Sequence, residues 1–122
     1  MPEEVRVSPD GSRILVTSSG QPSLEEMKRT LAKLEELRRQ HGIDRILVDS
    51  RARSSQPSMS EIFRGAELLA EKLGRRVRVA VLAGKPDADH EFFATTATNR
   101  GTAVRFFTSE DPALAWLARK DS

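Results

Sequence analysis

The amino-acid sequence predicts a single α/β domain over residues 1–122, with a mixed sheet built from an N-terminal antiparallel β-hairpin and the βαβ units that follow it. The length of 122 residues fits one domain. Short runs rich in β-branched residues alternate with longer segments in which apolar residues recur every three or four positions. The resulting order is β-β-α-β-α-β-α-β-α, and this alternation indicates parallel strands joined by right-handed crossovers.

The hairpin is predicted from two strand-like runs, residues 5–7 and 13–18, with the turn signal SPDG between them. Pro9 is favoured at the second position of such a turn, and Gly11 tolerates a positive φ angle. These two strands therefore form the antiparallel edge of the predicted sheet.

The first helix is predicted over residues 23–40, where one apolar stripe recurs at steps of three and four. Ser23 and Glu26 have the spacing of a capping box, and Gly42 follows the helix as a stop signal. The stripe consists of Leu24, Met27, Leu31, Leu34 and Leu37.

Residues 45–49 form a short apolar run typical of a buried strand, and a second helical stripe follows over residues 59–73. Gly74 ends that helix. Gly65 lies inside it at a cost of about 1 kcal/mol relative to alanine. Close packing of the helix against a strand would explain this glycine.

The last third of the chain repeats the same alternation. Residues 77–83 and 103–107 are predicted strands, and residues 89–100 a helix between them. Thr108 or Ser109 is expected to cap a final helix with Pro112 in its first turn. The inward face of this helix is predicted to contain Ala113, Trp116 and Leu117.

Three stretches carry a family resemblance: RILVDSR, VRVAVLAG and, most specifically, NRGTAVRFFTSEDPALAWL. They resemble the SpoIIAA-like, or STAS-like, small domains of bacteria, which belong to the group that includes CRAL-TRIO-like lipid carriers. The resemblance extends over nearly the whole chain from Ser23 onward. It implies a small mixed sheet with helices beside it, and a binding or regulatory module rather than an enzyme.

Anti-sigma-factor antagonists of this kind carry an Asp-Ser-Ser-Gly-like stretch whose serine is phosphorylated. In this chain Asp49-Ser50 is followed by Arg51-Ala52, which departs from that pattern. The resemblance therefore leaves Ser50 and Ser58 as weak phosphoacceptor candidates.

Two predicted loops, residues 50–58 and 84–88, follow the carboxyl ends of strands, where open parallel sheets bind ligands. Both lead into helix N-termini, which favour anions. Arg51 and Arg53 on an extended loop can clamp a phosphate or carboxylate. The alternative is a solvated polar connection.

Ser58 and Lys85 complete the set of candidates for binding an anion or a partner. Ser58 also has an ordinary structural interpretation, because with Glu61 it has the spacing of a second capping box.

Aromatic residues gather in the last third of the chain, where they fill either the core or an apolar pocket for a lipid-like ligand. Adjacent phenylalanines in a strand face opposite sides of the sheet, so one of each pair can lie at a pocket or subunit contact. Leu68 lies away from the main stripe of its helix, which suggests a dimer interface. The pocket or interface candidates are Phe92, Phe93, Phe107 and Leu68.

Several kinds of site are disfavoured. The chain has no cysteine, its two histidines lie in different elements, and no phosphate-binding loop motif is present, so we expect no metal and no cofactor. Asp89, His90 and Glu91 are consecutive in a helix and cannot converge, so no catalytic residue is assigned.

The overall charge and hydropathy indicate an ordinary globular protein. The net charge is only +2, from 20 basic and 18 acidic residues, and the short basic cluster at Arg75, Arg76 and Arg78 lacks exposed aromatics beside it. Nucleic-acid binding is therefore not expected. No apolar run approaches the roughly 20 residues of a membrane span, and the N-terminus does not look like a secretory signal, so a cytoplasmic location is the default expectation.

The resulting hypothesis is a non-catalytic module that binds a protein partner or a second copy of itself as a homodimer. One alternative is a carrier of a small apolar or amphipathic ligand. A third is an enzyme that acts on an anionic substrate at Arg51, Arg53, Lys85 and His90.

Overall fold

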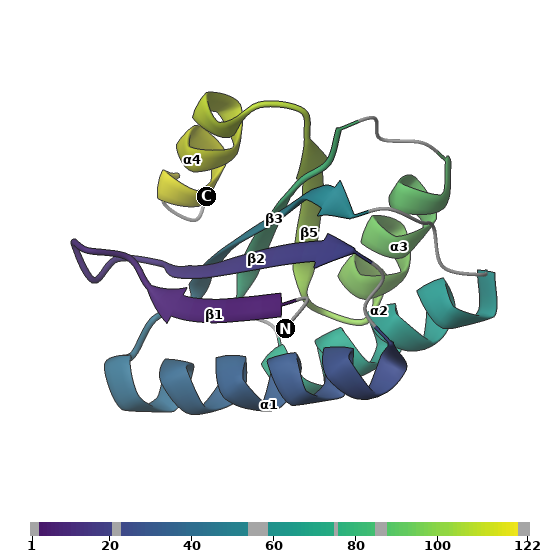
Figure 1. The fold of residues 1–122 in the computed structure, drawn as a ribbon, viewed down its shortest axis with the longest axis horizontal. Coiled ribbons are helices and arrows are strands. Elements are labelled where there is room, and N and C mark those ends of the chain that lie inside the picture. Colours follow the sequence, from purple (N-terminus) through teal and green to yellow (C-terminus); the bar gives the residue numbers. More distant parts are fainter. Residues whose placement is uncertain (1–2, 21–22, 54–58, 75, 85–87, 120–122) are drawn as a thin grey trace.

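One five-stranded sheet carries four helices (Figure 1). In chain order the elements are β1 (Glu3–Val7), β2 (Ile14–Gly20), α1 (Leu24–His41), β3 (Arg45–Arg53), α2 (Met59–Leu73), β4 (Arg78–Leu82), α3 (Ala88–Asn99), β5 (Ala103–Phe107) and α4 (Glu110–Ala118). The structure is a computed structural model and describes residues 3–20, 23–53, 59–74, 76–84 and 88–119. This order of elements confirms the one predicted from the sequence.

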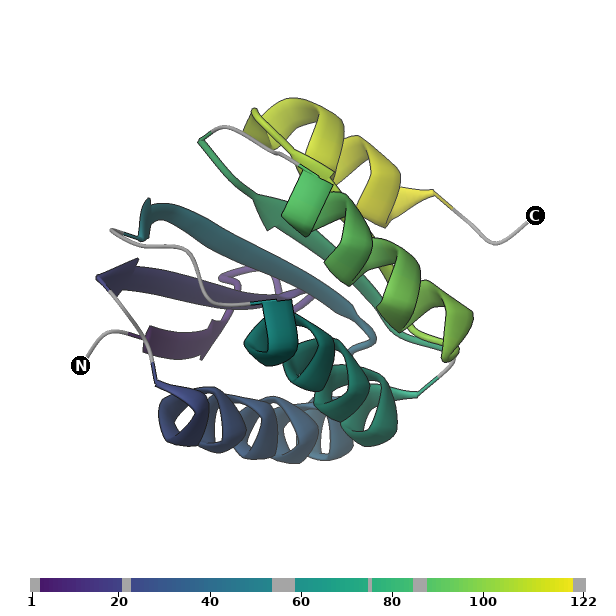
Figure 2. The same cartoon turned by 90° about the vertical axis from the view of Figure 1, so that its right-hand side faces the viewer.

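The strands lie in the sheet in their chain order, β1-β2-β3-β4-β5. β1 pairs with β2 in antiparallel orientation, and the other neighbouring pairs are parallel. Because each parallel connection advances one strand in the same direction and crossovers are right-handed, α1, α2 and α3 lie together on one face of the sheet. α4 follows the last strand and packs on the opposite face (Figure 2).

The face under α1, α2 and α3 carries the larger core. Alternate residues of the inner strands point into it, and Ile14, Ile46 and Val79 are almost completely buried there. The predicted apolar stripe of α1 packs against this core, and its residues Leu31 and Leu34 are buried there.

The opposite face is covered only in part. Leu47, Ala80 and Leu82 pack against Ala113 and Leu117 of α4 in a second, smaller core. α4 contacts β3, β4 and β5, and among the described residues it does not reach β1 or β2. The sheet therefore has one closed face and one face that is partly open.

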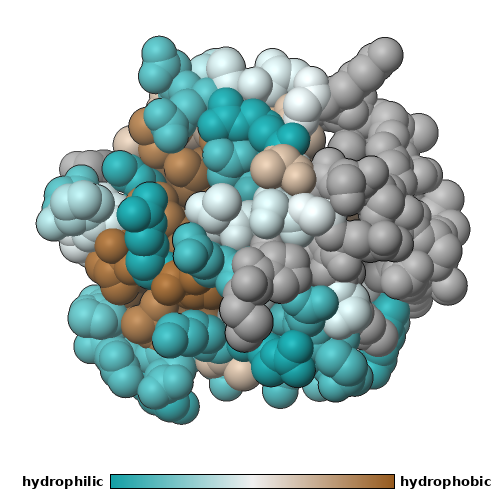
Figure 3. Space-filling model, viewed as in Figure 1, coloured by the Kyte–Doolittle hydropathy of each residue, from teal (hydrophilic) through white to brown (hydrophobic). Residues whose placement is uncertain are grey.

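We call the uncovered part of this second face the open sheet face, and it consists of Glu4, Arg6, Leu15, Thr17, Asp49 and Arg51. Leu15 packs against the smaller core and is half-buried, whereas its neighbours Arg6 and Thr17 are exposed. Figure 3 looks onto β1 and β2, and on the left of this view it shows apolar and hydrophilic side chains next to each other.

The ends of α1 follow the predicted local signals. Ser23 accepts a hydrogen bond from the Glu26 amide while the Glu26 side chain accepts one from the Ser23 amide, which completes the capping box. Gly42 has a φ angle of 67° and its amide donates to the Arg38 carbonyl at 2.8 Å. A left-handed residue at this position favours glycine, as the sequence predicts.

The predicted end of β3 is wrong by four residues. The sequence places the loop at Ser50, but the strand continues to Arg53 because β2 also continues and supplies backbone partners. Ala52 pairs with Ser19 and Arg53 with Gly20, beyond a shift in register between Thr17 and Ser19. Ser50 and Arg51 are therefore strand residues rather than loop residues.

The sequence-based explanation of Gly65 was close packing of its helix against a strand. In the structure Gly65 packs against two other helices instead. A Cβ atom at this position would lie 3.1 Å from Cε of Met27 in α1 and 3.4 Å from Cε2 of Phe93 in α3. The absence of a side chain allows α2 to lie close to both of its neighbours.

Leu68 is also placed differently from the prediction. Its side chain is 8% exposed and belongs to the larger core, so it is not available to a dimer interface. Because α2 lies between α1 and α3 as well as on the sheet, more of its circumference is buried than one apolar stripe would suggest.

Thr102 provides a test of this packing. It is fully buried, and its Oγ1 donates a 2.7 Å hydrogen bond to the carbonyl of Gly74, which joins the start of β5 to the end of α2. We expect Thr102→Val to lower the free energy of unfolding by about 1–3 kcal/mol, because the buried carbonyl loses this donor. Urea denaturation measures the change. Thr95→Val, at an exposed position of α3, is the control, and equal effects of the two substitutions would contradict this account.

Candidate functional site

The carboxyl end of β3 carries an ion pair between Asp49 and Arg51. The Arg51 guanidinium donates from Nε to Asp49 Oδ1 at 3.0 Å and from Nη2 to Oδ2 at 2.8 Å. The Arg51 amide also donates to Oδ1 at 3.1 Å. Residues two apart in a strand lie on the same side of the sheet, so this contact follows directly from their spacing.

The pair shifts the titration of both groups. Hydrogen bonds from the Arg51 side chain lower the pKa of the Asp49 carboxyl, against a smaller opposing effect of burial. The same contacts raise the pKa of Arg51. At neutral pH both groups are charged and each balances the other. An external anion at Arg51 therefore has to compete with a carboxylate that is already in place.

We expect the Arg51→Met variant to raise the pKa of Asp49 toward the ordinary value of about 3.9. A lowered pKa in the folded state stabilises the fold above the unfolded-state pKa, and this contribution disappears as the pH falls through the folded-state value. The contribution is small, since the side chains of Arg51 and Asp49 are 46% and 34% exposed. Carboxyl NMR titration measures the midpoint. An unchanged midpoint for Asp49 would show that Arg51 is not the cause.

Ser50 points to the other side of β3 and has a structural contact there. Its Oγ donates a 2.8 Å hydrogen bond to the carbonyl of Leu82, at the end of the neighbouring strand β4. A phosphoryl group on this oxygen would break that contact. The hydroxyl therefore has a structural use that does not require phosphorylation.

Several predicted site residues lie outside the part of the chain that the structure describes. Ser58 and Lys85 fall in undescribed segments, and the side chains of Arg53, His90 and Phe92 are likewise not described. The anion clamp between Arg51 and Arg53, and the capping role of Ser58, stay predictions.

The described aromatic side chains pack in pairs on the two faces of the sheet. Phe93 meets Phe106 edge to face in the larger core, with ring centroids 6.2 Å apart. Phe107 meets Trp116 on the α4 side at 5.9 Å. The adjacent residues Phe106 and Phe107 thus face opposite sides, as the alternation of a strand predicts.

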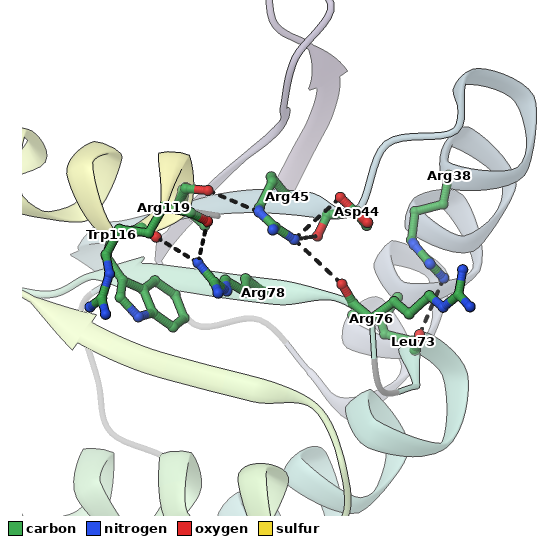
Figure 4. Close-up of polar contacts among 9 residues, drawn as sticks. Arg38, Asp44, Arg45, Leu73, Arg76, Arg78, Trp116 and Arg119 are labelled. Carbon is green, nitrogen blue, oxygen red and sulfur yellow. Dashed lines mark hydrogen bonds and ion pairs between the residues drawn. The ribbon is translucent and has the colours of Figure 1, made fainter. Parts of the chain in front are cut away.

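A cluster of arginines that the sequence did not reveal surrounds the C-terminal end of α4 (Figure 4). Arg45 at the start of β3 donates from Nε to the carbonyl of Leu117 at 2.9 Å. Arg78 at the start of β4 donates from Nη1 to the carbonyls of Trp116 and Arg119, at 3.1 and 2.7 Å. The last carbonyls of a helix lack partners within the helix and form its negative end, so these two cations anchor α4 on the sheet.

Trp116 lies beside two of these cations. The guanidinium carbon of Arg78 is 5.6 Å from the centroid of the indole ring, and that of Arg105 is 5.8 Å from it. Arg105 also lies 5.8 Å from the ring of Phe107. Cations over aromatic faces are attracted by the ring quadrupole, so these contacts add to the anchoring of α4.

We define the arginine cluster as Arg45, Arg76, Arg78, Arg105 and Arg119. Arg45 links it to Arg76, whose carbonyl accepts from Nη1 at 3.4 Å, and to the Asp44 carboxylate at 3.3 Å. The sequence indicated basic residues at 75, 76 and 78 but not their neighbours from other elements. Arg45 and Arg78 are the first residues of β3 and β4, each is followed by an apolar run, and the two pair directly with each other. An arginine at the start of each apolar run is the sequence signal that was missed.

Within the part of the chain that the structure describes, no group of three or more potential metal ligands comes together. No described helix combines the length and apolar character needed to cross a membrane.

Comparison with known proteins supports the fold. No family model and no curated protein matches the sequence. A solved structure with a similar fold is an uncharacterized protein of the DUF3478 family from Shewanella loihica PV-4, which has a SpoIIAA-like fold. The two chains are 21% identical, with a TM-score of 0.59, over 95% of this chain and 92% of the other. This chain therefore has a SpoIIAA-like α/β fold, which confirms the fold that the sequence resemblance implied.

Proposed function

We propose that this chain, with its SpoIIAA-like fold, is a non-catalytic binding module that captures a protein partner, or a second copy of itself, through the open sheet face. The observation that carries the proposal is the incomplete cover of the second sheet face. α4 packs over β3, β4 and β5, while the outer surface of β1 and β2 has no helix over it in the described chain.

The residues of the open sheet face suit a protein contact. The half-buried Leu15 is surrounded by charges of both signs, with Glu4 and Arg6 on β1 and the Asp49–Arg51 pair on β3. Protein interfaces commonly combine an apolar centre with a polar rim. The internal pairing of Asp49 with Arg51 supports a role in such a rim more than a role in gripping a free anion.

The open sheet face can be tested with one matched pair of variants. Thr17→Arg places a long cation beside Leu15, and Thr95→Arg places the same cation at an exposed position of α3, on the other side of the sheet. We expect Thr17→Arg to abolish self-association in sedimentation velocity, or stoichiometric co-purification of a protein partner, while Thr95→Arg has no effect.

Two outcomes would contradict the proposal. One is equal binding by the Thr17→Arg variant and the unaltered chain. The other is a reproducible hydrolase or transferase activity that a point substitution removes, because a non-catalytic module has no turnover to lose.

The carrier alternative is less well supported. Phe93 and Phe106 fill space against each other in the larger core, and Phe107 does the same with Trp116. Native mass spectrometry after gentle purification distinguishes the two functions, and we expect the mass of the bare chain or of its protein complex. A bound small molecule of reproducible mass would favour the carrier.

A further inference from the structure

We propose that the arginine cluster is a second contact surface, which binds an acidic segment of a protein partner. This surface lies at the amino ends of β3 and β4 and is separate from the open sheet face centred on Leu15. The inference goes beyond the proposed function, since it assigns a charge and a chemical class to what this end of the sheet binds.

Arginines from separate elements gather at this end of the sheet. Arg45, Arg78 and Arg105 come from three neighbouring strands, Arg119 from the end of α4, and Arg76 from the segment before β4. Arg45 and Arg78 donate to the main-chain carbonyls of Arg76 and Arg119, and Arg78 and Arg105 both lie over the ring of Trp116. Such a concentration creates a positive potential that favours binding of anions.

The arginines of the cluster differ in their contacts and exposure. Arg45 and Arg78 donate to main-chain carbonyls and hold α4 in place. Arg76, Arg105 and Arg119 are exposed, and none of them forms an ion pair with a carboxylate in the part of the chain that the structure describes. Arg105 also lies over the ring of Trp116, whereas Arg76 and Arg119 contribute only main-chain carbonyls to the contacts around α4, and all three side chains supply charge at the surface.

The surroundings of Trp116 favour an acidic peptide over a nucleic acid as the ligand of this surface. Proteins that bind single-stranded nucleic acids stack bases on exposed aromatic rings beside a basic groove. The ring of Trp116 already has the guanidinium groups of Arg78 and Arg105 against it. The exposed guanidinium groups of the cluster match carboxylates in bidentate geometry.

The test uses a short fluorescein-labelled oligoglutamate peptide and two double variants. Arg76→Gln with Arg119→Gln removes two exposed charges that make no side-chain bond with another described residue, so the fold is preserved. Arg29→Gln with Arg39→Gln removes two exposed charges from α1, on the other side of the sheet, and is the matched control. Fluorescence anisotropy measures the affinity. Trp116 is the only tryptophan of the chain, so its emission reports directly on the cluster.

We expect the unaltered chain to bind the peptide with a change in Trp116 emission and with an affinity that falls as salt is added. The Arg76/Arg119 variant should bind about tenfold more weakly, while the α1 control binds like the unaltered chain. Thr17→Arg should leave peptide binding unchanged, which separates this inference from the proposed function. No binding by the unaltered chain, or an equal loss in the α1 control, would overturn the inference. Tighter binding of a single-stranded oligonucleotide of equal charge would assign the surface to nucleic acid instead.

Discussion

Replacing Ile46 by alanine is expected to lower the free energy of unfolding by about 2–5 kcal/mol. Ile46 is completely buried in the central strand β3, and it pairs with Ile14 of β2 and Val79 of β4, which are also buried. Truncation therefore removes apolar contacts at the middle of the larger core, where the parallel strands hold the backbone and limit any collapse of the cavity. Urea denaturation followed by far-UV circular dichroism measures the loss.

The control for Ile46→Ala is Leu15→Ala on the open sheet face. Leu15 is apolar and lies on the adjacent strand β2, but it is only half-buried, so its truncation should cost clearly less. If the two substitutions lowered stability equally, the open sheet face would have to be as well packed as the larger core, and the account of an incompletely covered face would be wrong.

Replacing Arg78 by methionine is expected to destabilise the fold by about 2 kcal/mol. Methionine keeps much of the aliphatic volume but loses the hydrogen bonds to the carbonyls of Trp116 and Arg119 and the cation over the Trp116 ring. The loss should appear first in α4. Trp116 fluorescence is expected to change at a lower urea concentration than the circular dichroism of the whole chain.

Arg76→Met is the matched control for this effect. Arg76 is a neighbouring arginine, and only its main-chain carbonyl takes part in the contacts with Arg45, so its side chain can be replaced at little cost. If Arg78→Met and Arg76→Met had the same small effect, the hydrogen bonds of Arg78 would not be what holds α4. In that case the packing of Ala113 and Leu117 alone would be responsible.

The two faces of the sheet are stabilised in different ways. The larger core is closed by three helices, so its stability depends mainly on buried apolar contacts such as those of Ile46. The second face has one helix of nine residues, and charged side chains at the edge of the sheet help to hold it there. Both proposed contact surfaces therefore lie on the side of the molecule where the cover is least complete.

Local sequence signals predicted individual elements well. Ser23, Glu26 and Gly42 defined α1 because capping and left-handed backbone depend on residues close in the chain. β5 was predicted with the boundaries that the structure has, since a short apolar run between two stop signals leaves little choice. β3 was predicted too short, because its last residues are strand only through pairing with β2.

The candidate site was less predictable. The sequence indicated Arg51 as an anion ligand, but in the structure its guanidinium is already bound to Asp49. The contact forms because β3 continues to Arg53, so that these two residues, two apart in a strand, lie on the same side of the sheet. Leu68 was assigned to a possible interface, and it is buried because α2 has a helix on each side. The clamp with Arg53 and the roles of Ser58 and Lys85 stay predictions.

The sequence by itself determined the number, type and order of the strands and helices, because periodicity, caps and turn residues act within a few positions of one another. Only the tertiary structure decided that the strands lie in chain order, which places three helices on one face and α4 alone on the other. It also brought Arg45, Arg78 and Arg105 together around Trp116. Residues this far apart in the chain become neighbours through strand pairing and helix packing, and no local pattern specifies those contacts.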